Sequence, residues 1–371
     1  MMDRRETERL LAAIHQVRAG GEAAALAMVV RIRGSAYRRE GTRMLVRQDG
    51  TFECALSGGC LEPAVADAAE RVIATGEPVV VSYDLANDSV WGLGIGCSGA
   101  VDIRIERIED DAITNEWLAI LERGEAAVLV TPLSGVSGRM IVRASGEVVG
   151  DLRDSAIQQQ ACRQALERLS RRYPCSGAAD AGAAELFYEV TTSPPRLVIF
   201  GAGHDAAPVA QLAWTLGCAV TVVDVRDAFL TAERFPGATL VHAHFSEFAH
   251  KVAVNGDSLV LVMNHHLERD RESLRFSLES NAGYIGVLGP RSRYDRLLSG
   301  LSRQGYVPDP TRLHVVRSPV GLSLGAETPS EIAVAVLAEI VALRRGFDGG
   351  FLSGSVGSLH VAEATRLLAR S

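Results

Sequence analysis

The hydrophobic positions of the chain follow one rhythm up to about residue 190 and another after it. Over "AVDIRIERI", residues 101–106 alternate between apolar and charged side chains, which is the period of a half-buried strand. The segment "RMLVRQDGTFECAL" predicts a hairpin that turns at Asp49 and Gly50, and "AALAMVVRI" predicts a buried strand. The early part of the chain therefore favours short strands joined by tight turns.

Helices are interspersed with these strands. The segment "LEPAVADAAERVIATG" carries apolar residues on one helical face, with Pro63 in its first turn and Gly76 at its end. Beyond it we expect a strand in "AAVLVTPL", a hairpin around "ASGEVVG" and a helix that ends near "ERLSRRY". These elements predict a mixed α+β domain over residues 1–173.

From Arg196 onward, buried strands alternate with amphipathic helices. The strand segments are "RLVIFGAG", "AVTVVDVR", "DSLVLVMNH" and "YIGVLGP". This alternation predicts an α/β, Rossmann-like, doubly wound parallel sheet over residues 194–371. Between the two domains, "PCSGAADAGAA" is too small and polar to pack a core, so we predict a linker over residues 174–193.

Composition and net charge argue against a membrane-spanning, secreted or nucleic-acid-binding protein. The 371 residues are 47% hydrophobic and 22% charged, without the run of about 20 apolar residues that a membrane span needs. The N-terminal segment lacks the apolar core of a secretory signal, so we expect a cytoplasmic protein. A net charge of −7 argues against nucleic acid and membrane partners, and six scattered cysteines without a C-x-x-C pair indicate reduced thiols.

A nucleotide-binding pattern follows the first strand of the second domain. In "VIFGAGHDAAP", Gly201 and Gly203 belong to a G-x-G-x-x-A motif. Asp224 ends the next strand, where a carboxylate would accept hydrogen bonds from ribose hydroxyls. The alternative is that the glycines only serve packing of strand on helix and that Asp224 is a solvated strand end. His204 would crowd a pyrophosphate, or it caps the helix and faces water, and Arg226 leaves the kind of nucleotide open.

An arginine cluster marks the first domain. Its members share one glycine-containing stretch, "RIRGSAYRREGTRMLV", and are Arg31, Arg33, Arg38, Arg39 and Arg43. Planar guanidinium groups beside exposed backbone amides suit phosphate or an anionic heterocycle. A solvated charged face is the alternative.

The segment "LSGGCLEPAV" places a thiol directly before a predicted helix. Cys60 follows Ser57, Gly58 and Gly59, so we expect the helix amides to face its sulfur and favour a thiolate. Cys97 lies in a second glycine-rich loop, "GIGCSGA". A thiolate at Cys60 would ligate a metal or act as a nucleophile, whereas the other cysteines suit buried positions.

Several histidines lie near predicted strand ends. They are His242, His244, His250, His265 and His266. His242 and His244 are separated by one residue and would lie on the same face of a strand, which permits a metal site. No fixed ligand spacing completes such a site.

Six motifs in order along the chain resemble the XdhC/CoxI family of molybdoenzyme accessory proteins. They are "GSAYRREGTRMLV", "LSGGCLEPAV", "WGLGIGCSGAVDI", "IFGAGHDAAPVA", "YIGVLGPRSR" and "PVGLSLGAETPSEIAVAVLAEI". The family's loop cysteine corresponds to Cys60, and its second glycine-rich loop to the region of Cys97. Where the family usually has T-H-D, this chain has Asn264, His265 and His266.

The resemblance implies a cytoplasmic chaperone for molybdenum cofactor, in its molybdopterin or cytosine dinucleotide form. Such a chaperone assists sulfuration of the cofactor with a cysteine desulfurase. It then inserts the cofactor into an apo-molybdoenzyme of the xanthine dehydrogenase or aldehyde oxidase type. We expect a homodimer.

This function is our leading hypothesis, with Cys60 as the metal contact and no catalytic residue assigned. The expected cofactor-binding residues are Cys60, Cys97, Ser57, Gly58, Gly59, Arg38, Arg43, Gly201, Gly203, His204 and Asp224. The alternative is an NAD(P)-dependent oxidoreductase that binds its dinucleotide at Gly201 and Gly203 and uses Cys60 or His204 in catalysis. A third possibility is a scaffold that joins desulfurase and target enzyme without binding cofactor.

Overall fold

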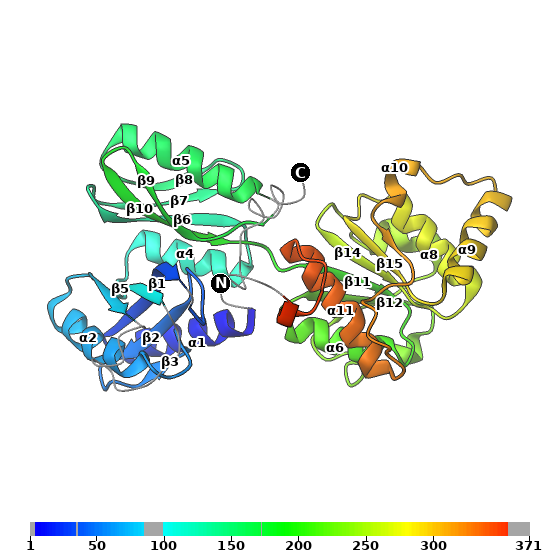
Figure 1. The fold of residues 1–371 in the computed structure, drawn as a ribbon, viewed down its shortest axis with the longest axis horizontal. Helices are drawn as coiled ribbons and strands as arrows, with labels where there is room; N and C mark the ends of the chain where they lie inside the picture. The colour runs from blue at the N-terminus through cyan, green and yellow to red at the C-terminus, as the bar shows by residue number, and fades with distance from the viewer. Residues whose placement is uncertain (1–3, 35, 85–98, 172, 355–371) are drawn as a thin grey trace. The chain divides into compact units, whose positions relative to one another are not determined.

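The computed structural model describes residues 4–34, 36–84, 99–171 and 173–354. The chain divides between Ser193 and Pro194 into two compact units, each described here by itself (Figure 1). The first unit holds two antiparallel sheets, and the second holds one parallel sheet. This result confirms the predicted fold class of a mixed α+β domain followed by a Rossmann-like domain.

The first sheet of unit 1 is antiparallel with the strand order β3-β2-β1-β5-β4. Its strands are β1 (Ala24–Gly34), β2 (Arg43–Arg47), β3 (Phe52–Glu53), β4 (Val79–Asp84) and β5 (Gly99–Arg107). Successive side chains of β1 point to opposite faces, so Ala25 and Ala27 pack with the face covered by α2 (Glu62–Thr75). Ala24 and Leu26 pack instead with α1 (Arg4–Gly20).

The second sheet of unit 1 is also antiparallel and has the order β8-β7-β6-β10-β9. Its strands are β6 (Ala127–Ser134), β7 (Arg139–Arg143), β8 (Val148–Asp151), β9 (Gly177–Ala181) and β10 (Ala184–Thr191). Helix α5 (Ser155–Ser170) covers one face through Ile157, Ala161 and Ala165. Helix α4 (Ala112–Arg123) covers the other face through Trp117 and Ile120.

The predicted linker over residues 174–193 is wrong over most of its length, because β9 and β10 occupy it. Strand β10 pairs with both β6 and β9, so it lies inside the sheet. The small side chains of β9 are compatible with this position: Ala178 packs beside Phe187 of β10 and Met28 of β1. Small residues here permit two sheets to approach, although the same composition is typical of a flexible tract.

A buried ion pair joins the two sheets of unit 1. Arg43 of β2 contacts Glu189 of β10, and the side chains are only 8% and 4% exposed. The Arg43 guanidinium also lies 5.9 Å from the Trp117 ring of α4. Because two charges removed from water stabilise each other only while both are present, this pair fixes the arrangement of β2, β10 and α4.

Unit 2 is built on a parallel sheet of order β13-β12-β11-β14-β15-β16. The strands are β11 (Arg196–Phe200), β12 (Ala219–Asp224), β13 (Thr239–His242), β14 (Ser258–Val262), β15 (Tyr284–Val287) and β16 (Val316–Arg317). The chain proceeds outward from β11 first to one side and then to the other. The carboxyl end of β11 is therefore a topological switch point, where ligands of such sheets bind.

Helices cover both faces of the parallel sheet, as Figure 1 shows. One face carries α6 (Ala206–Thr215) and α11 (Pro329–Arg345), and the other carries α8 (Leu267–Glu279) and α9 (Arg291–Arg303). Short elements complete the unit: η1 (Asp227–Phe229), η2 (Phe245–Glu247), α7 (Phe248–Lys251), α10 (Pro310–Leu313) and η3 (Leu352–Gly354). Within the described ranges, no helix combines the length and the apolar character needed to cross a membrane.

The buried ion pair of unit 1 yields a stability prediction. Arg43→Met should lower the free energy of unfolding of unit 1 by about 3–5 kcal/mol, because Glu189 would remain buried without its partner. The double variant Arg43→Met/Glu189→Leu should recover a large part of this loss. Urea unfolding of the full chain, followed by circular dichroism, measures both effects.

The matched control is Arg4→Met, which breaks the exposed pair of Arg4 and Glu8 and should cost less than about 0.5 kcal/mol. Equal losses in Arg4→Met and Arg43→Met would contradict the role assigned to the buried pair.

Candidate functional site

Two places in the chain collect the predicted site residues. The first is the loop that precedes α2 in unit 1, and the second is the carboxyl edge of the parallel sheet in unit 2. Each site is described within its own unit.

The loop before α2 is organised around the hydroxyl of Ser57. Its Oγ accepts hydrogen bonds from the backbone N–H groups of Gly59, Cys60 and Leu61, each at 3.2 Å. The same hydroxyl donates to Glu62 Oε2 at 2.5 Å. One side chain thus accepts hydrogen bonds from three consecutive amides directly before the helix.

Glu62 is the partner that holds this hydroxyl in place, and the sequence patterns did not single it out. Its side chain is buried, and it accepts the backbone N–H groups of Ser57 at 2.7 Å, Leu56 at 3.0 Å and Leu61 at 3.1 Å. Burial alone would raise the pKa of Glu62, but the hydrogen bonds from Ser57 and the backbone amides keep it below its usual value. An acidic residue in the first turn of a predicted helix was the available signal.

The Cys60 thiol is held at the edge of this network. Its Sγ donates to Ser57 Oγ at 3.3 Å, and the residue is partly exposed while packing against the core of the first sheet. The nearby amides point to Ser57 and Glu62 and not to the sulfur, which differs from the predicted arrangement. Cys97, in the second glycine-rich loop, lies outside the described residues.

Four of the five arginines of the predicted cluster bind carboxylates of the protein itself. Arg31 and Arg33 both donate to the buried Asp102, at 2.7–2.8 Å. Arg38 donates both terminal nitrogens to Glu6, at 2.6 and 3.2 Å. These contacts neutralise the positive charge of Arg31, Arg33 and Arg38, which the sequence pattern suggested was available to a ligand.

Arg43 is further removed from any ligand, since it is buried between the sheets beside Glu189. This position does not suit the predicted contact with a cofactor. Its charge and its hydrogen-bonding groups are directed into the interior of unit 1, where they hold the fold.

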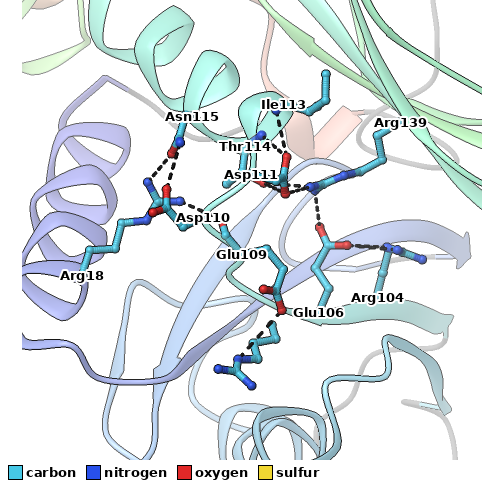
Figure 2. A network of polar contacts seen from close by, with 11 residues as sticks. Arg18, Arg104, Glu106, Glu109, Asp110, Asp111, Ile113, Thr114, Asn115 and Arg139 are labelled. Atoms are coloured by element: carbon cyan, nitrogen blue, oxygen red, sulfur yellow. Dashed lines mark hydrogen bonds and ion pairs between the residues drawn. The ribbon is translucent and has the colours of Figure 1, made fainter.

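Figure 2 shows a related network between the two sheets. Arg139 of β7 donates to Asp111, which precedes α4, and lies 3.7 Å from Glu106 of β5. Arg104 donates to Glu106 as well, at 3.0 Å. These residues line a cavity of about 580 Å³, but its charges are paired with one another.

At the carboxyl edge of unit 2, Gly201 is required by close packing. It has φ +111°, and a Cβ at this position would lie 2.6 Å from Asn264 Cα and from the Met263 carbonyl oxygen. The corresponding atom at Gly203 would meet only His265 Cδ2, at 3.5 Å. The first glycine therefore serves contact with the end of β14, while the second leaves room above the loop.

The start of α6 carries a contact between a carboxylate and an imidazole where a phosphate would bind. Asp205 Oδ2 lies 3.0 Å from His265 Nε2, and Asp205 is the N-cap residue of α6 without a side-chain cap hydrogen bond. His265 adopts φ +56°, which is uncommon for a residue with a side chain. A carboxylate at this helix start disfavours a pyrophosphate, and His204 beside it is exposed.

Asp224 is buried and occupied by hydrogen bonds from the protein. Its Oδ2 accepts hydrogen bonds from the Ala202 amide and from Arg226 Nη2, both at 2.7 Å. Its Oδ1 accepts hydrogen bonds from the Arg226 amide and from Arg226 Nε, both at 2.9 Å. A carboxylate has about four acceptor positions, so none remains for ribose hydroxyls in this arrangement. Burial would raise the pKa of Asp224, but Arg226 and the amides hold it below its usual range.

The histidines make separate contacts. His242 Nε2 lies 3.1 Å from the Val225 carbonyl oxygen, and His244 Nδ1 lies 3.2 Å from Ser246 Oγ. His266 accepts the Arg269 amide at the start of α8. Across the described part of the chain, no group of three or more histidine, cysteine, aspartate or glutamate side chains is placed to hold a metal ion.

Comparison with known proteins decides the family. Residues 17–84 match the model of the XdhC and CoxI family, and residues 197–340 match the XdhC Rossmann domain. A probable xanthine dehydrogenase subunit from Bacillus subtilis (strain 168) is 33% identical over 339 residues, which cover 87% of this chain and 94% of that protein. The chain belongs to the XdhC and CoxI family.

Two further proteins extend the similarity. The molybdenum cofactor insertion chaperone PaoD of Escherichia coli (strain K12) is 25% identical over 326 residues, covering 87% of this chain and 84% of that protein. A crystal structure described as a xanthine dehydrogenase from Bacillus halodurans superposes with a TM-score of 0.74 at 28% identity, covering 93% of this chain and 97% of that one. The resemblance to the XdhC/CoxI family is thus confirmed along nearly the whole chain.

The glycine-rich loop of unit 2 can be tested by its two glycines. Gly201→Ala should destabilise unit 2 by at least about 2 kcal/mol, because the new methyl group would overlap the backbone of Asn264 at an unfavourable φ. Gly203→Ala, in the same loop, should cost less than about 1 kcal/mol. Thermal unfolding of the two variants makes the comparison, and a similar loss in both would contradict the packing role of Gly201.

Asp224 leads to a prediction about pH. Asp224→Asn should destabilise unit 2 by about 2 kcal/mol at neutral pH, because an amide cannot replace the charged acceptor. The folded-state pKa is lowered, so this stabilisation is present above the unfolded value of about 3.9 and is lost as the pH falls through the folded value. Wild type and variant should therefore converge between about pH 5 and pH 2 in urea unfolding, and a constant difference would argue against an ionised Asp224.

Proposed function

We propose that this protein is a chaperone that binds molybdenum cofactor and inserts it into a molybdoenzyme of the xanthine dehydrogenase or aldehyde oxidase type. Its family and the name of its relative PaoD support this role. The observation in the structure that carries the proposal is the thiol of Cys60. It is partly exposed at a loop fixed by Ser57 and Glu62.

The loop leaves room for a ligand beside its glycines. Among the described residues, a Cβ built at Gly58 or Gly59 would meet no atom within 4 Å, so there is open space beside the two glycines that precede Cys60. Thiolates are preferred ligands of soft metal centres, and molybdenum in a dithiolene is such a centre. We infer that Cys60 contacts the cofactor while Ser57 keeps the sulfur in one position.

The finer parts of the proposal follow from the family. We propose that the protein assists sulfuration of the cofactor with a cysteine desulfurase and acts in the cytoplasm as a homodimer. We also propose that the nucleotide-type unit 2 takes part in holding the cofactor, in its molybdopterin or cytosine dinucleotide form. Cys97 remains a proposed second contact.

The oxidoreductase alternative has less support from the contacts at the edge of the parallel sheet. The Asp224 carboxylate already accepts hydrogen bonds from Arg226 and from the Ala202 amide. Asp205 places a carboxylate at the start of α6. Both features disfavour the usual pose of a dinucleotide, whose ribose needs a free acceptor and whose pyrophosphate needs free amides.

The Cys60 assignment can be tested by cofactor retention. Cys60→Ser should lower the molybdenum and pterin content per protein at least about tenfold after co-expression with the cofactor pathway, because an alcohol stays protonated and binds soft metals poorly. The fold should persist, because the sulfur makes one weak hydrogen bond. Metal analysis and thermal melting are the two measurements.

The matched control is Cys162→Ser, another partly buried thiol, which packs on the core of the second sheet. It should retain the wild-type content. Equal content in Cys60→Ser and wild type would refute the assignment, and loss only in Cys97→Ser would move the contact to the second glycine-rich loop.

A further inference from the structure

Arg226, two residues after the end of β12, is held along one edge of its guanidinium group. Its Nε and Nη2 donate to the two oxygens of Asp224, at 2.9 and 2.7 Å, and its own backbone amide donates to the same carboxylate. Asp224 is only 3% exposed, so this contact is shielded from solvent. The plane of the guanidinium is thereby fixed relative to the end of the strand.

One face of the same guanidinium rests on an aromatic ring. The Arg226 Cζ lies 4.1 Å from the centroid of Phe229 in η1. Arg234 reinforces this position, since it lies 5.1 Å from the same ring and donates to the Phe229 carbonyl at 2.7 Å. Its other terminal nitrogen donates to the Gly203 carbonyl at 3.2 Å, which ties η1 to the glycine-rich loop.

The Arg226 side chain is nevertheless 34% exposed. The side chain therefore stays partly open to a ligand, although Asp224 holds one edge of the guanidinium and Phe229 lies against it. It borders the switch point of the parallel sheet, where such sheets bind ligands. A flat cation fixed in this way resembles a base-stacking surface more than a flexible charge.

We propose that Arg226 is a stacking platform for a planar heterocycle, either a nucleobase or a pterin ring. The proposal rests on the proposed function, because molybdenum cofactor carries a pterin in both forms and a nucleobase in one. Arg226, Phe229 and Asp224 form the platform. Arg226 is the residue that contacts the ring, while the other two position it.

Recognition of a phosphate is the weaker assignment for this arginine. A bidentate grip on phosphate needs the Nε and Nη2 edge, which Asp224 already occupies. Asp224 also offsets the positive charge, and Asp205 adds a negative charge at the nearby helix start. Stacking needs none of these donors, because it uses only the face of the guanidinium.

The experiment measures binding to the full chain by calorimetry, with cytidine diphosphate, adenosine diphosphate, 6-hydroxymethylpterin and ribose 5-phosphate as probes. We expect wild type to bind at least one ring-bearing probe, with hypochromism of the ring absorbance, and to bind ribose 5-phosphate much more weakly. Binding of the diphosphates identifies a nucleobase, and binding of the pterin identifies the pterin ring.

Arg226→Lys should weaken binding of that probe at least about tenfold and remove the hypochromism, because lysine keeps the charge but has no plane. Phe229→Leu leaves the pair of Arg226 and Asp224 in place and should weaken binding as well. The matched control is Arg275→Lys on α8, which breaks a similar arrangement with Glu279 and the Tyr306 ring and should bind like wild type.

The platform is overturned if wild type binds no ring-bearing probe, if ribose 5-phosphate binds as tightly as they do, or if Arg226→Lys, with a wild-type melting temperature, binds equally well. Should Arg226→Lys melt early, Phe229→Leu decides: wild-type affinity in that variant also overturns the platform. Failure of the chaperone role is read separately, from the absence of molybdenum and pterin in the wild-type protein after co-expression with the cofactor pathway.

Discussion

Both candidate sites depend on backbone amides that donate to a buried carboxylate. Glu62 gathers the amides of the loop that carries Cys60, and Asp224 binds the Ala202 amide in the glycine-rich loop together with Arg226. A buried carboxylate is stable only when its acceptor positions are filled, and loop amides are stable away from water only when they have acceptors. The buried carboxylate supplies acceptors for the loop amides, and the amides supply donors for the carboxylate. These loops are therefore held in one conformation although they are neither helix nor strand.

The regular elements could be predicted because their periods are local properties of the sequence. The alternation in 101–106, the helix between Pro63 and Gly76 and the buried runs after Arg196 each carry their own signal, and the structure contains all of them. The segment 177–191 could not be predicted in this way. Its strands are stabilised by pairing with β6 and by contacts of small residues with β1, neither of which leaves a local pattern.

The candidate site residues were found more easily than their contacts. The Cys60 loop and the glycine motif stand out by composition, but the partners of the arginines lie far away along the chain: Arg43 meets Glu189, and Arg31 meets Asp102. A run of like charges in the sequence therefore indicates which residues need counter-charges, not whether these come from a ligand or from the protein. Glu62 was missed for a related reason, since an acidic residue at a helix start is usually read as a response to the helix dipole.

Helix α4 couples the stability of the two sheets of unit 1. Trp117 and Ile120 complete the core of the second sheet, while Leu118 of the same helix packs with Leu45 of the first sheet and with α1. Neither sheet has a complete apolar interior when α4 is detached. The two sheets are therefore one cooperative folding unit, in which amide protection against hydrogen exchange is shared across both and neither sheet persists as an autonomous fragment.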